Sequence, residues 1–188
     1  MKISKEKAAE NRQALIQAAS RLFKEKGIDG VGVAEISKAA GLTHGALYAH
    51  FSSKDELAAA AFGYSAESAR ERMASNVRSL EQLMDFYMTP GQRDNLSGGC
   101  ALAAAASEIA RQDEKVSARF MEGYTQMVRF AENELSGKFP PAEARERALA
   151  LVAAMIGGIA VSRSVFKADQ ALADEVLAAV RKAVGSLT

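Results

Sequence analysis

The chain has 188 residues, of which 48% are hydrophobic, three are proline and none is tryptophan, a composition that favours a globular, helical protein over a β-sandwich. The formal net charge of +1 is unevenly divided, because residues 1–54 carry nine Lys and Arg against five Asp and Glu, and the remainder is net negative. A single cysteine excludes an internal disulfide framework.

No apolar segment typical of a signal peptide follows Met1, and we expect a cytoplasmic protein. The longest nearly unbroken apolar run, residues 148–161, is shorter than the roughly 18 residues that a membrane helix needs, so no membrane partner is expected.

The N-terminal segment divides into a polar arm and a first helix. Residues 1–10 are charged and are predicted to form a loose arm. Residues 11–26 are predicted to form an amphipathic helix that Gly27 ends, because apolar residues recur at helical spacing. These are Leu15, Ala18, Ala19, Leu22 and Phe23.

Residues 33–56 have the pattern of two short helices joined by a tight turn. Gly41 can adopt the positive φ that ends the first helix, and Thr43 is a suitable N-cap for a second helix over residues 44–50. Apolar side chains occur where the two helices must pack, at Ile36, Ala40, Leu42, Leu47 and Phe51. This pattern predicts a helix-turn-helix, whose second helix lies in the major groove of DNA.

The outward face of that second helix is small and aromatic rather than charged, which suits close approach to a large partner. It comprises His44, Gly45, Ala46, Tyr48, Ala49 and His50. The S-x-x-E sequence at residues 53–56 predicts a further helix, and Lys54 in its first turn suits an external phosphate. The alternatives are a small three-helix core with a chance pattern, and an ordinary exposed lysine.

Residues 41–57, GLTHGALYAHFSSKDEL, resemble the recognition-helix signature of the TetR/AcrR family of bacterial transcriptional regulators, and the likeness covers about the first sixty residues. The resemblance implies phosphate contacts by Tyr48, His50 and Lys54, and positions near bases or backbone for Thr43, His44, Gly45 and Ala49. Gly32 departs from the family pattern, which has a capping Ser or Thr there, and Ala49 replaces a larger side chain. Sequence preference is therefore expected to depend more on DNA shape.

The rest of the chain is also predicted to be helical, with helices over residues 54–73, 80–88, 100–111, 114–135, 141–165 and 170–184 and a loop from Pro90 to Gly99. The whole chain is thus all-α, with about nine helices. A DNA-binding domain over residues 1–54 precedes a ligand-binding and dimerisation domain over residues 55–188. No Pro or Gly-rich linker interrupts the helix that joins them. Movement in the ligand-binding and dimerisation domain, called the body from here on, can therefore reach the DNA-binding domain.

Residues 148–161 are apolar on every face of their predicted helix, so this helix must be covered on more than one side. A second subunit would provide that cover, and Gly157-Gly158 would allow close approach. The family resemblance implies the same homodimer, with two helices from each subunit. The predicted interface residues are Val152, Ile156, Ile159, Leu172, Val176 and Val180; the alternative is a core helix of a monomer.

Flexible Met and aromatic side chains in the body suit an adaptable apolar cavity. The predicted ligand-binding residues are Phe62, Met84, Tyr87, Cys100, Phe120, Tyr124 and Met127. Most could equally be plain core, and the resemblance implies a small-molecule effector without giving its class. Cys100, at a predicted helix start, is a candidate redox or electrophile sensor, or else a buried small hydrophobe.

The sequence contains no catalytic or metal-binding motif, and the only two histidines lie on the predicted DNA face. We therefore expect no enzyme activity, catalytic residue, metal or cofactor. The predicted function is a ligand-responsive transcriptional regulator, most simply a repressor that binds a palindromic double-stranded operator as a homodimer. The alternative is a helical protein-interaction module, which would lack the steep salt dependence of DNA binding.

Overall fold

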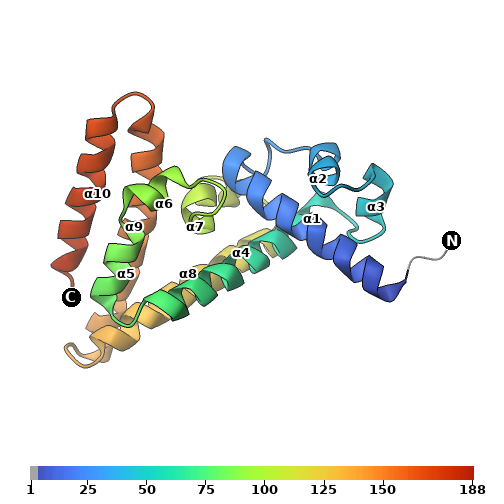
Figure 1. Cartoon of the computed structure of the whole chain (residues 1–188). Helices are drawn as coiled ribbons and strands as arrows, with labels where there is room; N and C mark the ends of the chain where they lie inside the picture. The colour runs from blue at the N-terminus through green and yellow to red at the C-terminus, as the bar shows by residue number, and fades with distance from the viewer. Residues whose placement is uncertain (1–3) are drawn as a thin grey trace.

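The computed structural model describes residues 4–188, and every regular element in that range is a helix (Figure 1). The all-α prediction is confirmed, with ten α-helices and one 3₁₀ helix in the described range. They are α1 (Lys5–Lys26), α2 (Val33–Ala39), α3 (His44–Tyr48), α4 (Lys54–Asn76), α5 (Leu80–Tyr87), α6 (Pro90–Asp94), α7 (Ala101–Ala105), the 3₁₀ helix (Ile109–Arg111), α8 (Glu114–Leu135), α9 (Pro141–Phe166) and α10 (Gln170–Gly185).

Three predicted elements need correction. The loose arm is wrong for its described part, because α1 already begins at Lys5, where the Ser4 hydroxyl accepts the Lys7 N–H at 3.1 Å; the arm's Lys2 lies outside the described residues. The loop after Pro90 contains α6, because proline is well suited to the first turn of a helix. The predicted helix over residues 100–111 is divided into α7 and the 3₁₀ helix.

The apolar side chains form two cores, one at each end of the molecule. The first lies among α1, α2, α3 and the start of α4, and it contains the fully buried Ile36, Leu47 and Phe51, as predicted. The second lies among α5, α8, α9 and α10. Figure 1 shows α4 and α8 running between these two ends. One uninterrupted helix, α4, therefore contributes to both the N-terminal bundle and the body.

The apolar helix α9 is packed between α8 and α10 of the same chain. The complete helix is longer than the apolar run of residues 148–161, and by length and composition alone it could cross a membrane. Its packing against α8 and α10, however, is that of a core helix. Val152, Ile156 and Ile159 are at most 6% exposed within the protomer. Their prediction as dimer-interface residues is therefore wrong, because their side chains are buried in the core that α9 forms with α8 and α10 of the same protomer.

Candidate nucleic-acid interface and ligand cavity

The turn between α2 and α3 fixes the direction of the second helix. Gly41 adopts a φ of +68°, which ends α2, and the Leu42 N–H then donates to the Ser37 carbonyl at 2.9 Å. The Thr43 hydroxyl caps α3 by accepting the Ala46 N–H at 3.3 Å, as the sequence predicts. Leu47 is completely buried beneath α3, so the opposite face of this helix points outward.

That outward face carries one large side chain among small ones. Tyr48 is 53% exposed, and its ring meets the His44 ring edge to face at 5.3 Å between centroids. A Cβ added at Gly45 would meet no atom within 4 Å, so a partner surface could approach the backbone there closely. Of the other predicted contact residues, Thr43 and Ala49 are exposed and Ala46 is half-buried.

Of the three predicted phosphate-contact residues, Tyr48 is the last residue of α3, and His50 and Lys54 follow the helix. The helix ends at Tyr48, two residues earlier than predicted, and the N–H of half-buried His50 donates to the Leu47 carbonyl. Lys54 is half-buried at the first position of α4, whose first turn presents backbone N–H groups. His50 and the first turn of α4 thus follow α3 directly along the chain.

Hydrogen bonds by serines hold the start of α4. The Ser53 hydroxyl accepts the Glu56 N–H at 3.1 Å, whereas the Glu56 carboxylate accepts both the N–H and the hydroxyl of Ser52, at 2.7 and 2.6 Å. The two bonds from Ser52 lower the pKa of Glu56, which keeps this carboxylate ionised and bound to the turn. At the start of α2, Gly32 provides no side-chain cap, as expected from its departure from the family pattern.

One cation near this surface, Arg12, was not predicted from the sequence. The exposed Arg12 of α1 places its guanidinium 4.9 Å from the centroid of the Phe51 ring. Arg12 is distant in sequence from the helix-turn-helix, and no local pattern indicates that α1 brings it to Phe51.

The body contains a cavity of about 360 Å³ between α4, α5, α7 and α8. Four of the predicted ligand-binding residues line it: Phe62, Tyr87, Cys100 and Met127. The other three do not. Met84 is buried in the second core, the Tyr124 hydroxyl donates to the Leu149 carbonyl of α9 at 3.2 Å, and Phe120 packs between the two cores. Met–aromatic composition alone does not separate cavity walls from filled core.

In the cavity wall, Cys100 is held by two hydrogen bonds. Its sulfur accepts the Tyr87 hydroxyl and, as the N-cap of α7, also the Ala103 N–H at 3.5 Å. Burial and the neighbouring Cys100 raise the pKa of Tyr87 well above its ordinary value, so the phenol remains protonated and donates. The sulfur and the phenol are therefore mutually oriented at one end of the cavity.

Arginine is the only charged residue type lining the cavity in the described part of the chain. Arg70 and Arg119 are paired with the carboxylates of Glu67 and Glu122 on their own helices. By contrast, Arg72 donates only to the Gly98 carbonyl, at 3.4 Å. The sequence did not single out these arginines, because α4 and α8 contribute them separately.

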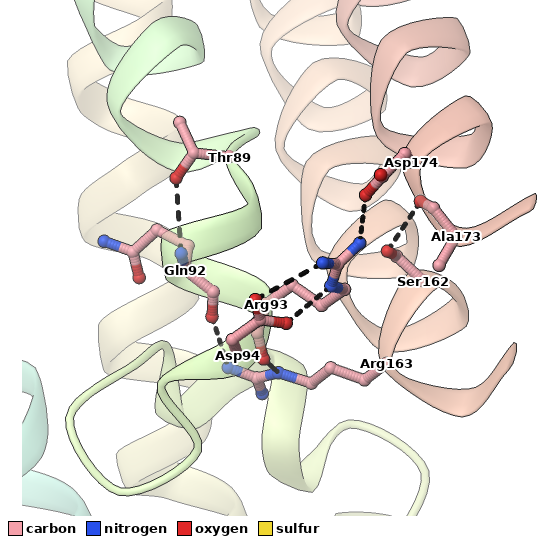
Figure 2. A network of polar contacts seen from close by, with 8 residues as sticks. All are labelled: Thr89, Gln92, Arg93, Asp94, Ser162, Arg163, Ala173 and Asp174. Atoms are coloured by element: carbon pink, nitrogen blue, oxygen red, sulfur yellow. Dashed lines mark hydrogen bonds and ion pairs between the residues drawn. The ribbon is translucent and has the colours of Figure 1, made fainter. Parts of the chain in front are cut away.

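A polar network fixes α6 against the two C-terminal helices (Figure 2). Arg93 is only 2% exposed, and its guanidinium donates to Asp94 at 2.7 Å and to Asp174 of α10 at 2.5 Å. Arg163 of α9 donates to the carbonyls of Gln92 and Arg93, at 2.9 and 3.0 Å. This network holds the chain that leads into Cys100.

Two family descriptions match consecutive parts of this arrangement. Residues 15–61 match the bacterial regulatory proteins of the tetR family, and residues 76–174 match the C-terminal domain of LmrA/YxaF-like transcriptional regulators. The chain belongs to the TetR family. The expected resemblance is thereby confirmed, and so is the prediction that the chain is not an enzyme, because this is a family of transcriptional regulators.

Similar TetR-family proteins come from several bacteria. The chain is 44% identical to the HTH-type transcriptional regulator AcrR of Shigella flexneri over 54 residues, 29% of this chain and 25% of AcrR. It is 35% identical to the HTH-type transcriptional repressor Rv1474c of Mycobacterium tuberculosis over 115 residues, 59% of this chain and 55% of the repressor. These matches thus span less than two thirds of either relative.

Among solved structures, a TetR transcriptional regulator from Chloroflexus aurantiacus superposes with a TM-score of 0.79 at 24% identity, covering 96% of both chains. The reduced form of Escherichia coli NemR gives a TM-score of 0.73 at 18% identity, covering 92% of this chain and 95% of NemR. At these identities the likeness concerns the fold.

Proposed function

We propose that this TetR-family chain is a cytoplasmic repressor that binds a palindromic DNA operator as a homodimer and releases it when a small molecule occupies the body cavity. The observation that carries the proposal is the outward face of α3. A half-exposed Tyr48 lies there among small residues, and its neighbour in the chain, Leu47, is completely buried. A solvated helix face without a partner would be expected to carry charged side chains instead.

We propose both base contacts and phosphate contacts for this surface. Thr43, His44 and Tyr48 lie on the exposed face that would enter the major groove, and Gly45 permits close approach. His50, Lys54 and the first turn of α4 would contact phosphate. The net charge of +4 on residues 1–54, nine cations less five anions, supports binding to a polyanion.

The surface left uncovered on α9 and α10 supports the homodimer. Along α9, Ala153 and Val161 are exposed, and a Cβ added at Gly157 would meet nothing within 4 Å. On α10, Leu172 is 43% exposed, and Val176 and Val180 are half-buried. The outward residues of α9 thus replace its buried ones in the interface. A dimer would hold two α3 helices for half-sites about 34–36 Å apart.

The continuity of α4 supports control by a ligand. The same helix begins at Lys54 beside the α3 face and contributes Phe62, Ala69 and Met73 to the cavity wall. A ligand that binds one position of α4 more tightly than another would shift the population of dimers whose α3 spacing fits the operator.

Genomic DNA capture tests the DNA-binding assignment. Fragmented DNA from the source genome is captured on the wild type, on Tyr48→Ala and on Met121→Ala, and is then sequenced. Met121, on α8, is a matched control because it is also a large exposed side chain, at 58% exposure. We expect a few palindromic intergenic sites that Tyr48→Ala loses and Met121→Ala retains. No enrichment at low salt, or equal capture by Tyr48→Ala, would instead favour a protein-interaction module.

A further inference from the structure

Three cations without a carboxylate partner lie near one another where the DNA-binding domain, here called the head, joins the body. The side chain of Lys24, half-buried in the last turn of α1, forms no hydrogen bond or ion pair with any residue from 4 to 188. Arg72 of α4 has only the Gly98 carbonyl. Arg163 of α9 uses backbone carbonyls as acceptors, and its Nη1 is buried without any partner in the described chain.

These cations are close enough to affect one another. Burial lowers the pKa of Lys24, the positive charges of Arg72 and Arg163 lower it further, and the neighbouring Cys100 and Glu25 act in the opposite direction. Burial likewise lowers the pKa of Arg163. Lys24 and Arg163 are partly removed from water, whereas Arg72 is exposed beside them, and like charges so placed disfavour each other unless an anion compensates them. The protein retains this unfavourable arrangement, so the position is suited to a bound anion.

Arg72 connects this cluster to the apolar cavity. It lines the 360 Å³ cavity and also a more polar cleft of about 550 Å³ between α1 and α4, which Lys24 lines as well. Ser65, on the same helix, is likewise shared by the two spaces. A molecule whose apolar body contacts side chains such as Phe62 and Met127 can therefore place one end beside Arg72, the member of the cluster that also lines the cavity.

We propose that the effector is an amphipathic anion, with an apolar body in the cavity and a single carboxylate, sulfonate or phosphate bound by Arg72 and Lys24. The inference rests on the proposed function and specifies the chemical class of its ligand. The volume lies in the range of about 300–1,000 Å³ that is usual for sites of small organic ligands. Charge-assisted hydrogen bonds to guanidinium and ammonium groups give the anion its preference over a neutral analogue.

The position of the cluster also relates the anion to DNA binding. Lys24 belongs to α1, which packs against the helix-turn-helix formed by α2 and α3. Arg72 lies in the C-terminal half of α4, which belongs to the body. The two helices are already joined nearby by the buried hydrogen bond between the Ser20 and Ser65 hydroxyls, at 2.7 Å. An anion bound by both cations adds a second link between α1 and α4, and it biases the position of the head.

Two matched dyes test the proposal in the full chain. Anilinonaphthalene sulfonate has an apolar body and one anionic group, and phenylnaphthylamine has the same body without the sulfonate. Both fluoresce in apolar sites, and the chain has no tryptophan to interfere. The dissociation constants are compared for wild type, Arg72→Gln, Lys24→Gln and Arg145→Gln, with circular dichroism as the folding check. Arg145→Gln removes one exposed arginine, paired with Glu132 at 2.9 Å, outside the cavity.

We expect the wild type to bind the sulfonate at least about tenfold more tightly than the neutral dye, an advantage of about 1.4 kcal/mol. Decanoate should displace the sulfonate dye better than methyl decanoate does. Arg72→Gln and Lys24→Gln should each lose most of the preference and keep neutral-dye binding, whereas Arg145→Gln should keep both.

Equal binding of the two dyes, or an undiminished preference in Arg72→Gln, would overturn the anion assignment and leave a neutral effector possible for the proposed regulator. If neither dye nor decanoate binds, both the anion assignment and the cavity as effector site are wrong. Neither result bears on the DNA-capture experiment, so the two proposals fail separately.

Discussion

Two glycines inside helices predict opposite effects of the same substitution to alanine. Gly158 of α9 faces α10, and an added Cβ would lie 2.8 Å from Met88 Cε and 3.1 and 3.2 Å from Val180 Cγ1 and Cβ. Gly63 of α4 is matched to it, but the nearest atom to its added Cβ would be Arg119 Cδ, at an ordinary 4.0 Å. We predict that Gly158→Ala destabilises the protein and that Gly63→Ala stabilises it.

The magnitudes follow from two opposing contributions. Replacing a mid-helix glycine by alanine stabilises a helix by about 0.8–1.0 kcal/mol, and Gly63→Ala should show this gain almost unreduced. At Gly158 the stiff, β-branched Val180 cannot rotate away easily, so α9 and α10 must separate slightly, and such overpacking costs about 1–3 kcal/mol. The net loss at Gly158 is about 1 kcal/mol, which separates the two variants by about 2 kcal/mol.

Thermal unfolding followed by circular dichroism at one fixed protein concentration measures this difference. For a chain of this length, each kcal/mol corresponds to about 2–4 °C, so the two midpoints should lie about 4–8 °C apart on opposite sides of the wild type. A Gly158→Ala variant as stable as Gly63→Ala would refute the close contact between α9 and α10.

Three further substitutions test the head, the cation cluster and the dimer. Leu22→Ala truncates a side chain of the first core that is only 4% exposed, and it should lower the free energy of unfolding by about 2–5 kcal/mol. The variant should also lose capture of operator DNA, although no DNA contact is removed. Undiminished capture would contradict the idea that α1 supports the helix-turn-helix. Lys24→Met should raise the unfolding midpoint at neutral pH, because burial and Arg72 disfavour the ammonium group of Lys24 and lower its pKa. This gain in stability should fade as the pH rises toward 10.5, where lysine in the unfolded chain also loses its proton. A gain that does not change with pH would contradict this cause. The Cβ added by Gly157→Leu meets no atom of the protomer within 4 Å, and this variant should give monomers in sedimentation without loss of helical dichroism, whereas a persistent dimer would place the interface elsewhere.

Short-range patterns in the sequence determined most of the secondary structure. The cap at Thr43, the turn at Gly41 and the S-x-x-E sequence before Lys54 each act over three or four residues, and the structure shows the corresponding helix starts. The bounds of α8 and the start of α9 agree for the same reason. The apolar spacing in α1 likewise identified its buried face, because polar residues occupy the other side.

Tertiary structure alone decided which face of α9 is buried and where the body is hollow. Residues 148–161 are apolar all round, so helical periodicity could not distinguish buried Val152 from outward Gly157; the positions of α8 and α10 make that distinction. The cavity is a place where packing is incomplete, and no single helix encodes such a gap. The cluster of Lys24, Arg72 and Arg163 depends on three helices meeting, and electrostatic interaction depends on distance in space rather than separation along the chain.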